Sequence, residues 1–166
     1  MTKGQVEKKV RDLLIPLTNY PHMPYWASLK EAMVQLTLAQ QALAPGERRR
    51  TVLVFDEAYK LQGILNQKDI LRGIEPSFAR SPQTTTPLAW EDLLATGAQE
   101  QAKKAIKEFM SPVGHVAQAD DSLIKVSHIM LADNLDLLPV MEGGKVLGVV
   151  RLDDIFHEIS LTILAV

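Results

Sequence analysis

Two aspartates, Asp69 and Asp154, stand at matching places in two similar stretches of the sequence. Residues 60–71 and 145–156 both run from a lysine to a glycine, two apolar residues and then an aspartate six positions after the glycine. In each stretch a strand-like run changes into a helical pattern just before the aspartate. A carboxylate at such a transition either hydrogen-bonds to the first turn of the helix or contacts a ligand, so both aspartates are candidate site residues.

The two stretches differ in the residue that lies three positions before the aspartate. Asn66 precedes Asp69 in the pattern of a helix N-cap with an acidic residue in the first turn, which stabilises a helix by about 1 kcal/mol. Arg151 is a poor N-cap, although Asp153 offers an alternative cap, so a structural reading explains Asp154 less well. Both a capping role and a ligand role stay open for Asp69.

Motifs of catalysis are missing from the sequence. It contains no nucleophile elbow, phosphate-binding loop or dinucleotide fingerprint. There is no cysteine, and the four histidines lack the spacing of metal ligands, so no metal site is expected. The histidines are His22, His115, His128 and His157. Enzymatic activity is therefore the least supported class of function.

The similarity extends beyond the aspartates. Residues 10–17 and 106–113 agree in hydrophobicity, charge sign and proline position at every place but one. Two copies of one unit predict a pseudo-symmetric module in which each copy buries its apolar face against the other. Ser28 and Ser122 mark helix starts, and Ser28 with Glu31 has the pattern of a capping box.

Hydrophobic periodicity and turn residues give the order of elements in each copy. In the first copy we expect a helix over 6–14 that ends before Pro16, a helix after 28, strands over 51–55 and 60–65, and a helix from about 67. In the second we expect a short strand over 113–117, a helix over 123–132, a hairpin of strands 137–141 and 145–150, and a helix from 153. Between them, residues 76–87 are expected to form a loop and 88–110 a helix broken at Gly97.

Composition sets the broad class. The chain has 166 residues, of which 46% are apolar, and a formal net charge of -2. These values predict one compact module without a nucleic-acid footprint. No apolar run is long enough to span a membrane and no secretory h-region is visible, so we expect a cytoplasmic protein. The run of arginines at 48–50 is either a solvated loop or a group that reaches a polyphosphate.

The repeated order of helix, short strand, helix, two strands and helix resembles a tandem pair of cystathionine β-synthase (CBS) domains, often called a Bateman module. The second copy is the nearer match, at 110–112, 122–123, 138–140 and 148–154, and the first carries insertions near 40–50. The resemblance implies an α+β fold in which two repeats pack sheet to sheet. It places the first repeat at 1–75, a linker at 76–105 and the second repeat at 106–166.

The resemblance also implies a ligand. Such pairs commonly bind adenosine derivatives, among them AMP, ADP, ATP and S-adenosylmethionine, in the cleft between the repeats. In the family motif a glycine permits close approach, a serine or threonine or a helix N-terminus meets phosphate, and an aspartate accepts hydrogen bonds from two ribose hydroxyls. The matching positions here are Gly63, Asn66 and Asp69 in the first copy and Gly148, Arg151 and Asp154 in the second.

Further positions follow from the same resemblance. In the family, the segment after the conserved proline contacts the base, which indicates Tyr20 and His22 in the first copy and His115 and Val116 in the second. The aromatic residues either stack on adenine or pack their own loop. Arg151 replaces the family hydroxyl and either pairs with a phosphate or fills the cleft and excludes the ligand.

The sequence thus predicts a non-enzymatic regulatory module that needs no cofactor, binds an adenosine derivative and signals by a conformational change in which residues 88–110 move. The alternative is an interaction or dimerisation module with degenerate, empty clefts. Both hypotheses predict a homodimer that acts on a regulated protein partner, with no nucleic-acid or membrane partner. Two apolar helix faces are candidates for the dimer contact. They carry Leu29, Met33 and Leu36, and Val126, Ile129 and Met130.

Overall fold

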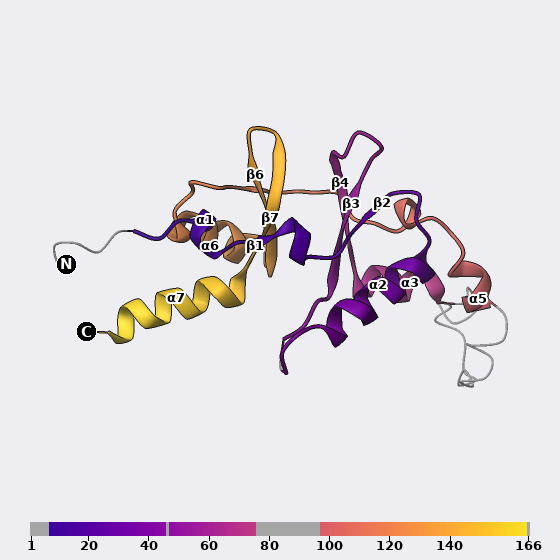
Figure 1. The fold of residues 1–166 in the computed structure, drawn as a ribbon, viewed down its shortest axis with the longest axis horizontal. Coiled ribbons are helices and arrows are strands. Elements are labelled where there is room, and N and C mark those ends of the chain that lie inside the picture. Colours follow the sequence, from indigo (N-terminus) through magenta and orange to yellow (C-terminus); the bar gives the residue numbers. More distant parts are fainter. Residues whose placement is uncertain (1–6, 46, 76–96, 166) are drawn as a thin grey trace. The chain divides into compact units, whose positions relative to one another are not determined.

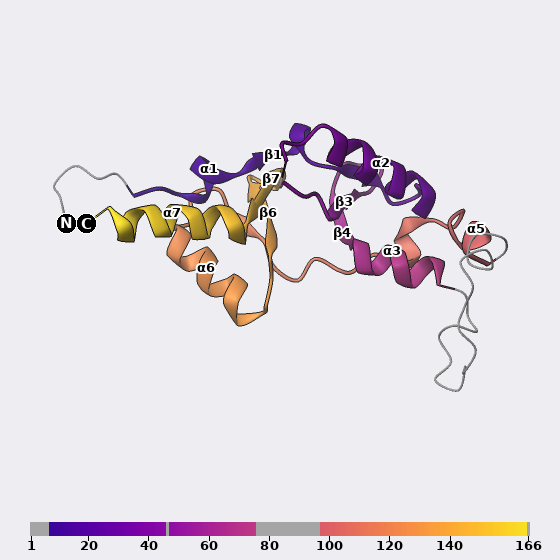
Figure 2. The ribbon, with the colours of Figure 1, turned by 90° about the horizontal axis from the view of Figure 1, so that it is seen from below.

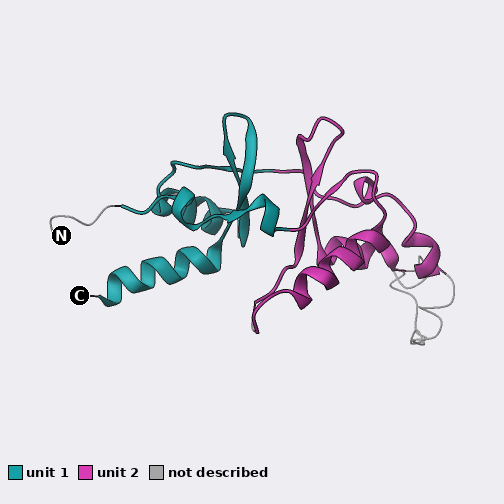
Figure 3. Ribbon diagram, viewed as in Figure 1, with its two compact units in different colours: residues 1–20, 114–166 teal, residues 21–113 magenta. Residues whose placement is uncertain are grey.

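The structure, a computed structural model, describes residues 7–45, 47–75 and 97–165. The chain forms two compact units: unit 1 contains residues 1–20 and 114–166, and unit 2 contains residues 21–113 (Figure 3). Both units combine helices with a small sheet, so the predicted α+β class is confirmed. No helix among the described residues is long and apolar enough to cross a bilayer.

Unit 2 is built on a three-stranded sheet in the order β2-β3-β4 (Figure 1). Its strands are β2 (His22–Pro24), β3 (Thr51–Phe55) and β4 (Leu61–Asn66). Strand β3 pairs parallel with β2 and antiparallel with β4. The helices among its described residues are α2 (Leu29–Gln41), α3 (Gln67–Ile74), the short α5 (Gly97–Gln101) and the 3-10 helix η3 (Ile106–Glu108).

Unit 1 repeats this plan and adds one edge strand. Its sheet has the order β1-β7-β6-β5, in which β6 pairs parallel with β5 and antiparallel with β7. The strands are β1 (Ile15–Pro16), β5 (Ala117–Gln118), β6 (Leu137–Glu142) and β7 (Lys145–Arg151). The helices are α1 (Val10–Leu13), the 3-10 helix η1 (Leu17–Asn19), α6 (Leu123–Ala132) and α7 (Leu152–Leu164), with α6 and α7 side by side (Figures 1 and 2).

Local signals explain most of these elements. Ser28 Oγ accepts a hydrogen bond of 3.1 Å from the backbone N–H of Glu31, and Ser122 Oγ accepts an equivalent bond from Lys125, so both serines cap their helices. Between β6 and β7, Gly143 and Gly144 have positive φ angles of 58° and 80°, which this tight turn requires. The predicted strands of both hairpins are confirmed to within two residues.

Three predicted elements differ from the structure. The first helix covers only Val10–Leu13, because Lys9 has extended backbone angles and pairs with Ser122. The strand predicted over 113–117 is confined to Ala117–Gln118. The helix predicted up to 110 is not continuous: α5 covers Gly97–Gln101, and the chain then continues through turns and η3. The predicted break at Gly97 lies at the edge of the described residues and stays a prediction. Residues 76–96, which include the predicted loop and part of the predicted helix, lie outside the described residues.

The repeats exchange the segments that precede them. Val10 is fully buried in the core of unit 1, where its N–H donates to the carbonyl of Asp121, and β1 pairs with β7. The equivalent Ile106 is fully buried in the core of unit 2, where its N–H donates to the carbonyl of Ala27. Each core is therefore completed by a segment that lies next to the other copy in the sequence. The repeat boundaries at 75 and 106 stay a prediction about sequence copies, and the compact units divide the chain differently.

Each unit has its own apolar core. The core of unit 1 contains α6, the inward face of the β6-β7 hairpin and Ile155 of α7, and the core of unit 2 contains α2, β3, Leu65 and Ile70. Of the residues predicted to form a dimer face, Leu29, Leu36, Val126 and Met130 are buried core residues. The aspartate-bearing junctions β4-α3 and β7-α7 are thus each anchored on a packed core.

Candidate functional site

The junction between β4 and α3 in unit 2 is closed by a reciprocal pair of hydrogen bonds. Asn66 is the N-cap of α3, and its Oδ1 accepts from the N–H of Asp69 at 2.9 Å. The Asp69 carboxylate accepts in return from the N–H of Asn66 at 3.0 Å. This is a capping box, so the structural role that the sequence predicts for the two residues is confirmed.

Asp69 is buried, with 4% of its surface exposed, and its carboxylate has further neighbours. Arg72 Nη1 donates to Oδ1 at 3.2 Å, and Ser111 Oγ lies 3.5 Å from both carboxylate oxygens. These groups use the lone pairs that a ribose would need. Ser111 also places a hydroxyl beside Asp69, the group that position 66 lacks. A ligand role for Asp69 therefore remains a prediction and requires these contacts to rearrange.

The junction between β7 and α7 in unit 1 is held by an ion pair. Arg151 is the N-cap residue of α7 but makes no side-chain capping bond. Its Nε and Nη2 donate to the two carboxylate oxygens of Asp154 at 2.9 and 3.0 Å, which is the parallel, two-bond geometry of a guanidinium on a carboxylate. The Arg151 side chain is 22% exposed and that of Asp154 is 30% exposed.

The two junctions differ in what solvent and ligands can reach. At Asp69 the carboxylate is enclosed by its own helix start. At Asp154 a carboxylate and a guanidinium lie together at a partly exposed helix N-terminus, which favours anions. If the pair opens, the carboxylate can accept from hydroxyls while the guanidinium binds an anion. The unit 1 junction is therefore the better placed of the two for ligand binding.

Gly63 and Gly148 each allow another backbone segment of the chain to pack closely against them. A Cβ on Gly148 would overlap the carbonyl of Ile15 in β1, and one on Gly63 would lie 2.8 Å from the carbonyl oxygen of Ser111. Ile64 and Ser111 form an isolated bridge that is the counterpart of the β1-β7 pairing. The exchanged segments thus occupy the space that we expected a ligand to approach.

Tyr20 and His22 belong to different units. Tyr20 is buried in unit 1, and its N–H donates to the carbonyl of Leu17. His22 lies in β2 of unit 2 with its ring edge-on to Phe55 and Tyr59, at centroid distances of 5.9 and 6.1 Å. The contacts of His22 are those of a packed aromatic cluster, and stacking of either ring on adenine stays a prediction.

His115 and Val116 are accessible in unit 1, just before β5. His115 is exposed, with its Nε2 facing the carboxylate of Asp133, and these groups form an ion pair when the imidazole is protonated. Val116 is also exposed. Both are free of the core, so their predicted contact with a base remains a prediction. Among the described residues, no group of three or more histidine, aspartate or glutamate side chains is arranged to hold a metal ion.

Sequence reasoning missed Ser111 and Arg72 as neighbours of Asp69. The position of Arg72, three residues after Asp69 in a helix, is a signal that was available. Ser111 lies far away in the sequence, and only the repeat offers a hint, since Ser111 and Ile15 are the single mismatched position between residues 10–17 and 106–113. Ser111 takes the place of Ile15 beside a β-strand glycine and adds a hydroxyl there.

Comparison with known proteins agrees with this architecture. Residues 106–161 match the family model of the CBS domain. The CBS-pair protein CBSX2 from Arabidopsis thaliana aligns with a TM-score of 0.70 and 18% identity over 97% of this chain and 99% of that chain. No curated protein sequence matches the chain.

Some of the similar structures were solved with ligands. CBSX2 in complex with AMP aligns with a TM-score of 0.66 and 18% identity, over 94% of this chain and 98% of that chain. A CBS domain pair in complex with 5′-methylthioadenosine and S-adenosyl-L-methionine aligns with a TM-score of 0.65 and 22% identity, over 95% and 99%. The chain therefore has the fold of a tandem CBS domain pair.

Proposed function

We propose that this chain is a regulatory module that binds an adenosine derivative. Binding changes its conformation, and the module acts on a protein partner through this change. The observation that carries the proposal is the Arg151–Asp154 pair at the partly exposed start of α7. It sits at the position where the CBS motif has a hydroxyl and an aspartate, and similar CBS pairs were solved with AMP and with S-adenosyl-L-methionine. On this basis the module is non-enzymatic, needs no cofactor and works in the cytoplasm.

In this proposal Asp154 accepts hydrogen bonds from the ribose, and Arg151 turns from Asp154 to a negatively charged group of the ligand. The guanidinium thus replaces the hydroxyl of the family motif. The start of α7 then has two arrangements, one with Arg151 paired to Asp154 and one with both side chains paired to the ligand. The ligand favours the second arrangement when its contacts offset the loss of the internal ion pair. His115 and Val116 are proposed to contact the base. The corresponding residues in unit 2, Gly63, Asn66 and Asp69, form a second site only if the capping box opens.

The test is thermal unfolding with and without AMP, ADP, ATP and S-adenosylmethionine. A ligand at about 100 times its Kd adds about 2.7 kcal/mol, so the expected rise in Tm is about 5 to 10 °C for a chain of this size. Asp154→Ala should abolish the rise, whereas Asp153→Ala, which removes an exposed charge from the same helical turn, should keep it. Equal rises in both variants would contradict the proposed site.

A pure interaction module is the second candidate, and the same ion pair is the observation that favours it. If Arg151 fills the site permanently, none of the four ligands raises the Tm of the natural chain. Arg151→Thr, which restores the family hydroxyl and releases Asp154, should then create binding. A natural chain that responds to none of them while Arg151→Thr does respond would identify a degenerate site.

A homodimer is proposed under either function. Several large apolar side chains are exposed on the helices of both units. They are Met33, Val34 and Leu38 on α2, Ile124 and Leu131 on α6, and Phe156, Leu161, Ile163 and Leu164 on α7. Exposed apolar residues that gather on helix faces are typical of an interface. Light scattering on the purified chain should give twice the monomer mass, and a monomer at high concentration would contradict the proposal.

A further inference from the structure

One end of the unit 2 sheet carries a group of aromatic side chains, which we call the aromatic edge. It lies where β2 and β3 end and β4 begins, away from the Asn66–Asp69 capping box at the other end of β4. Two of its rings are open to solvent, since Trp26 is 57% exposed and Tyr59 is 62% exposed. The members of the aromatic edge are Tyr25, Trp26, Phe55 and Tyr59.

The rings of the aromatic edge hold one another in place. The Tyr59 ring stacks on Phe55 with a centroid distance of 4.8 Å and an interplanar angle of 17°. Trp26 lies edge-on to Tyr25 at a centroid distance of 5.2 Å. The N–H of Tyr25 donates to the carbonyl of Phe55 at 2.9 Å, which joins the two pairs of rings. Side chains fixed in this way lose little further freedom when they bind, so the edge is suited to recognition.

Tyr59 presents its ring from an unfavourable backbone conformation. Its φ angle is 61°, in the left-handed region, and for a residue with a bulky side chain this angle costs free energy. Tyr59 precedes Lys60, and in unit 1 the residue before the matching Lys145 is Gly144, with a φ angle of 80°. Glycine adopts such angles without strain, so the turn itself does not require an aromatic residue. Backbone strain gathers at functional sites, and here it indicates a role for the Tyr59 side chain.

The equivalent positions in unit 1 carry no aromatic side chain. There the N–H of Ala119 donates to the carbonyl of Met141, which is the bond that joins the two pairs of rings in unit 2. The counterparts of Tyr25, Trp26, Phe55 and Tyr59 are thus Ala119, Asp120, Met141 and Gly144, in that order. The same arrangement of strands forms in unit 1 without the rings, so the aromatic edge is a special feature of unit 2 that the fold does not require.

The charges beside the rings balance one another. The Tyr25 hydroxyl hydrogen-bonds to the carboxylate of Glu57, and this bond raises the pKa of Tyr25. The Nζ of Lys107 lies 5.6 Å from the centre of the Tyr25 ring. The turn after β3 adds one acidic residue, Asp56, and one basic residue, Lys60. Since neither sign of charge dominates, the aromatic edge favours an uncharged partner.

We propose that the aromatic edge binds an uncharged, proline-rich segment of a partner protein. Such a segment forms an extended helix without internal hydrogen bonds, whose proline rings lie on aromatic side chains. The exposed rings of Trp26 and Tyr59 offer the surfaces for these contacts. The indole N–H of Trp26 can only donate, so it suits a segment that is rich in carbonyl groups and poor in N–H groups.

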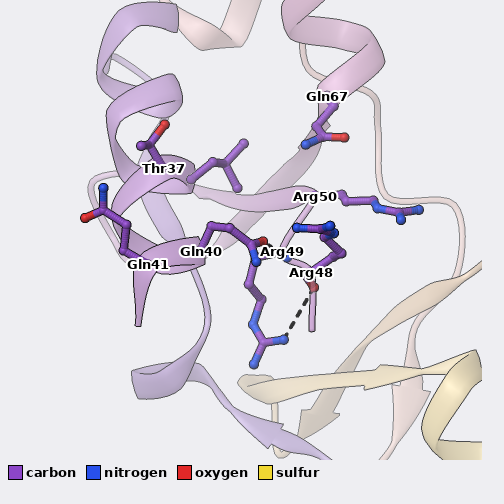
Figure 4. Close-up of a pocket in the computed structure, with 8 residues that line it drawn as sticks. Thr37, Gln40, Gln41, Arg48, Arg49, Arg50 and Gln67 are labelled. Carbon is purple, nitrogen blue, oxygen red and sulfur yellow. Dashed lines mark hydrogen bonds between the residues drawn. The ribbon is translucent and has the colours of Figure 1, made fainter. Parts of the chain in front are cut away.

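A nucleic acid fits the aromatic edge less well, because balanced charges do not attract a phosphate backbone. The arginines of unit 2, at 48–50, lie at the other end of β3, where they line a pocket with α2 and the start of α3 (Figure 4). The inference rests on the proposed action on a protein partner. It does not rest on the adenosine derivative, because the Arg151–Asp154 pair belongs to unit 1.

The test is a titration of the isotope-labelled chain with acetyl-decaproline amide, an uncharged peptide, followed by NMR chemical shifts. We expect saturable shifts at residues 25–26 and 56–60. The double variant Trp26→Gln/Tyr59→Asn removes both exposed rings and should raise the Kd at least about fivefold. Both residues are exposed and asparagine tolerates a left-handed φ, so the fold should persist. Trp26→Phe should give an intermediate Kd, because phenylalanine keeps a ring and loses the N–H.

The matched control is Phe156→Gln, which removes an exposed aromatic ring from unit 1. This control and Asp154→Ala should bind decaproline as the natural chain does. Absence of saturable shifts at the aromatic edge, or an equal loss of binding in the double variant and in either control, would overturn the proposal. Binding of the neutral oligosaccharide maltohexaose at these rings, without binding of decaproline, would also overturn it. The adenosine proposal is tested separately by the rise in Tm, so a failure of one proposal can be told from a failure of the other.

Discussion

Substitution of Gly148 by alanine should separate β1 from the sheet of unit 1. Gly148 pairs with Pro16, and a Cβ at this position would overlap the backbone carbonyl of Ile15. A flexible side chain could turn away from such a methyl group, but a backbone carbonyl moves only with its strand. The methyl group therefore displaces β1 and loosens the segment that carries the buried Val10.

The magnitude follows from two opposing effects. Forcing an extra methyl group into a packed site costs about 1 to 3 kcal/mol, and contact with backbone favours the upper part of that range. Replacement of glycine by alanine also reduces the conformational freedom of the unfolded chain, which stabilises the fold by about 0.4 to 1 kcal/mol. The free energy of unfolding should therefore fall by about 1.5 to 2.5 kcal/mol in Gly148→Ala.

Gly114 supplies the control for this substitution. A Cβ there would meet nothing within 4 Å, and Gly114 is not among the residues with positive φ. Gly114→Ala should leave the free energy of unfolding unchanged or raise it slightly. Urea unfolding followed by circular dichroism measures both variants, and a difference between them of less than about 0.5 kcal/mol would refute the argument that β1 is locked by this contact.

Two further predictions concern hydrogen bonds at helix starts. Asn66→Ala should lower the free energy of unfolding by about 1 kcal/mol, because α3 loses its N-cap. Asn66→Ser keeps a capping oxygen and should retain most of this stability. Urea unfolding measures both variants, and equal losses would contradict the capping role. The second prediction concerns Asp121. Burial alone would raise the pKa of Asp121, but hydrogen bonds from the Gln118 N–H and from Lys125 lower this pKa below the ordinary 3.8. The carboxylate of Asp121 therefore stabilises the folded state above pH 3.8, and this stabilisation is lost as the pH falls below that value. Asp121→Asn should remove this part of the acid dependence of unfolding, whereas Asp136→Asn, at an exposed position, should leave it in place. If the stability of both variants depends on pH in the same way, the role given to Asp121 is wrong.

Local signals in the sequence predict a large part of this fold. Ser28 and Ser122 cap helices as expected, and α6 covers the predicted residues 123–132, because a polar cap followed by helical periodicity is decided within a few neighbouring residues. Asn66 and Asp69 form the predicted capping arrangement for the same reason. The strands β3, β4, β6 and β7 follow from apolar runs between turn residues.

Contacts between distant residues could not be predicted in this way. The repeat shows that Val10 and Ile106 are equivalent, but equivalence does not reveal which core each of them enters. The role of Gly148 depends on Ile15, and the Asp69 carboxylate lies 3.5 Å from the hydroxyl of Ser111. Both partners are remote in the sequence. The same holds for Arg49, whose burial requires α2, α3 and the insertion to come together.

The exchange of segments sets an order in which the molecule can be assembled. During synthesis, unit 2 is complete once residue 113 has been made, and its core can then close without help from later residues. Residues 8–20 are older than all of unit 2, yet β7, their partner strand, is made only afterwards. They have no partner strand until β7 has been made, and a pairing between segments so far apart in the sequence forms slowly. The first described segment to be synthesised is thus among the last to reach its place.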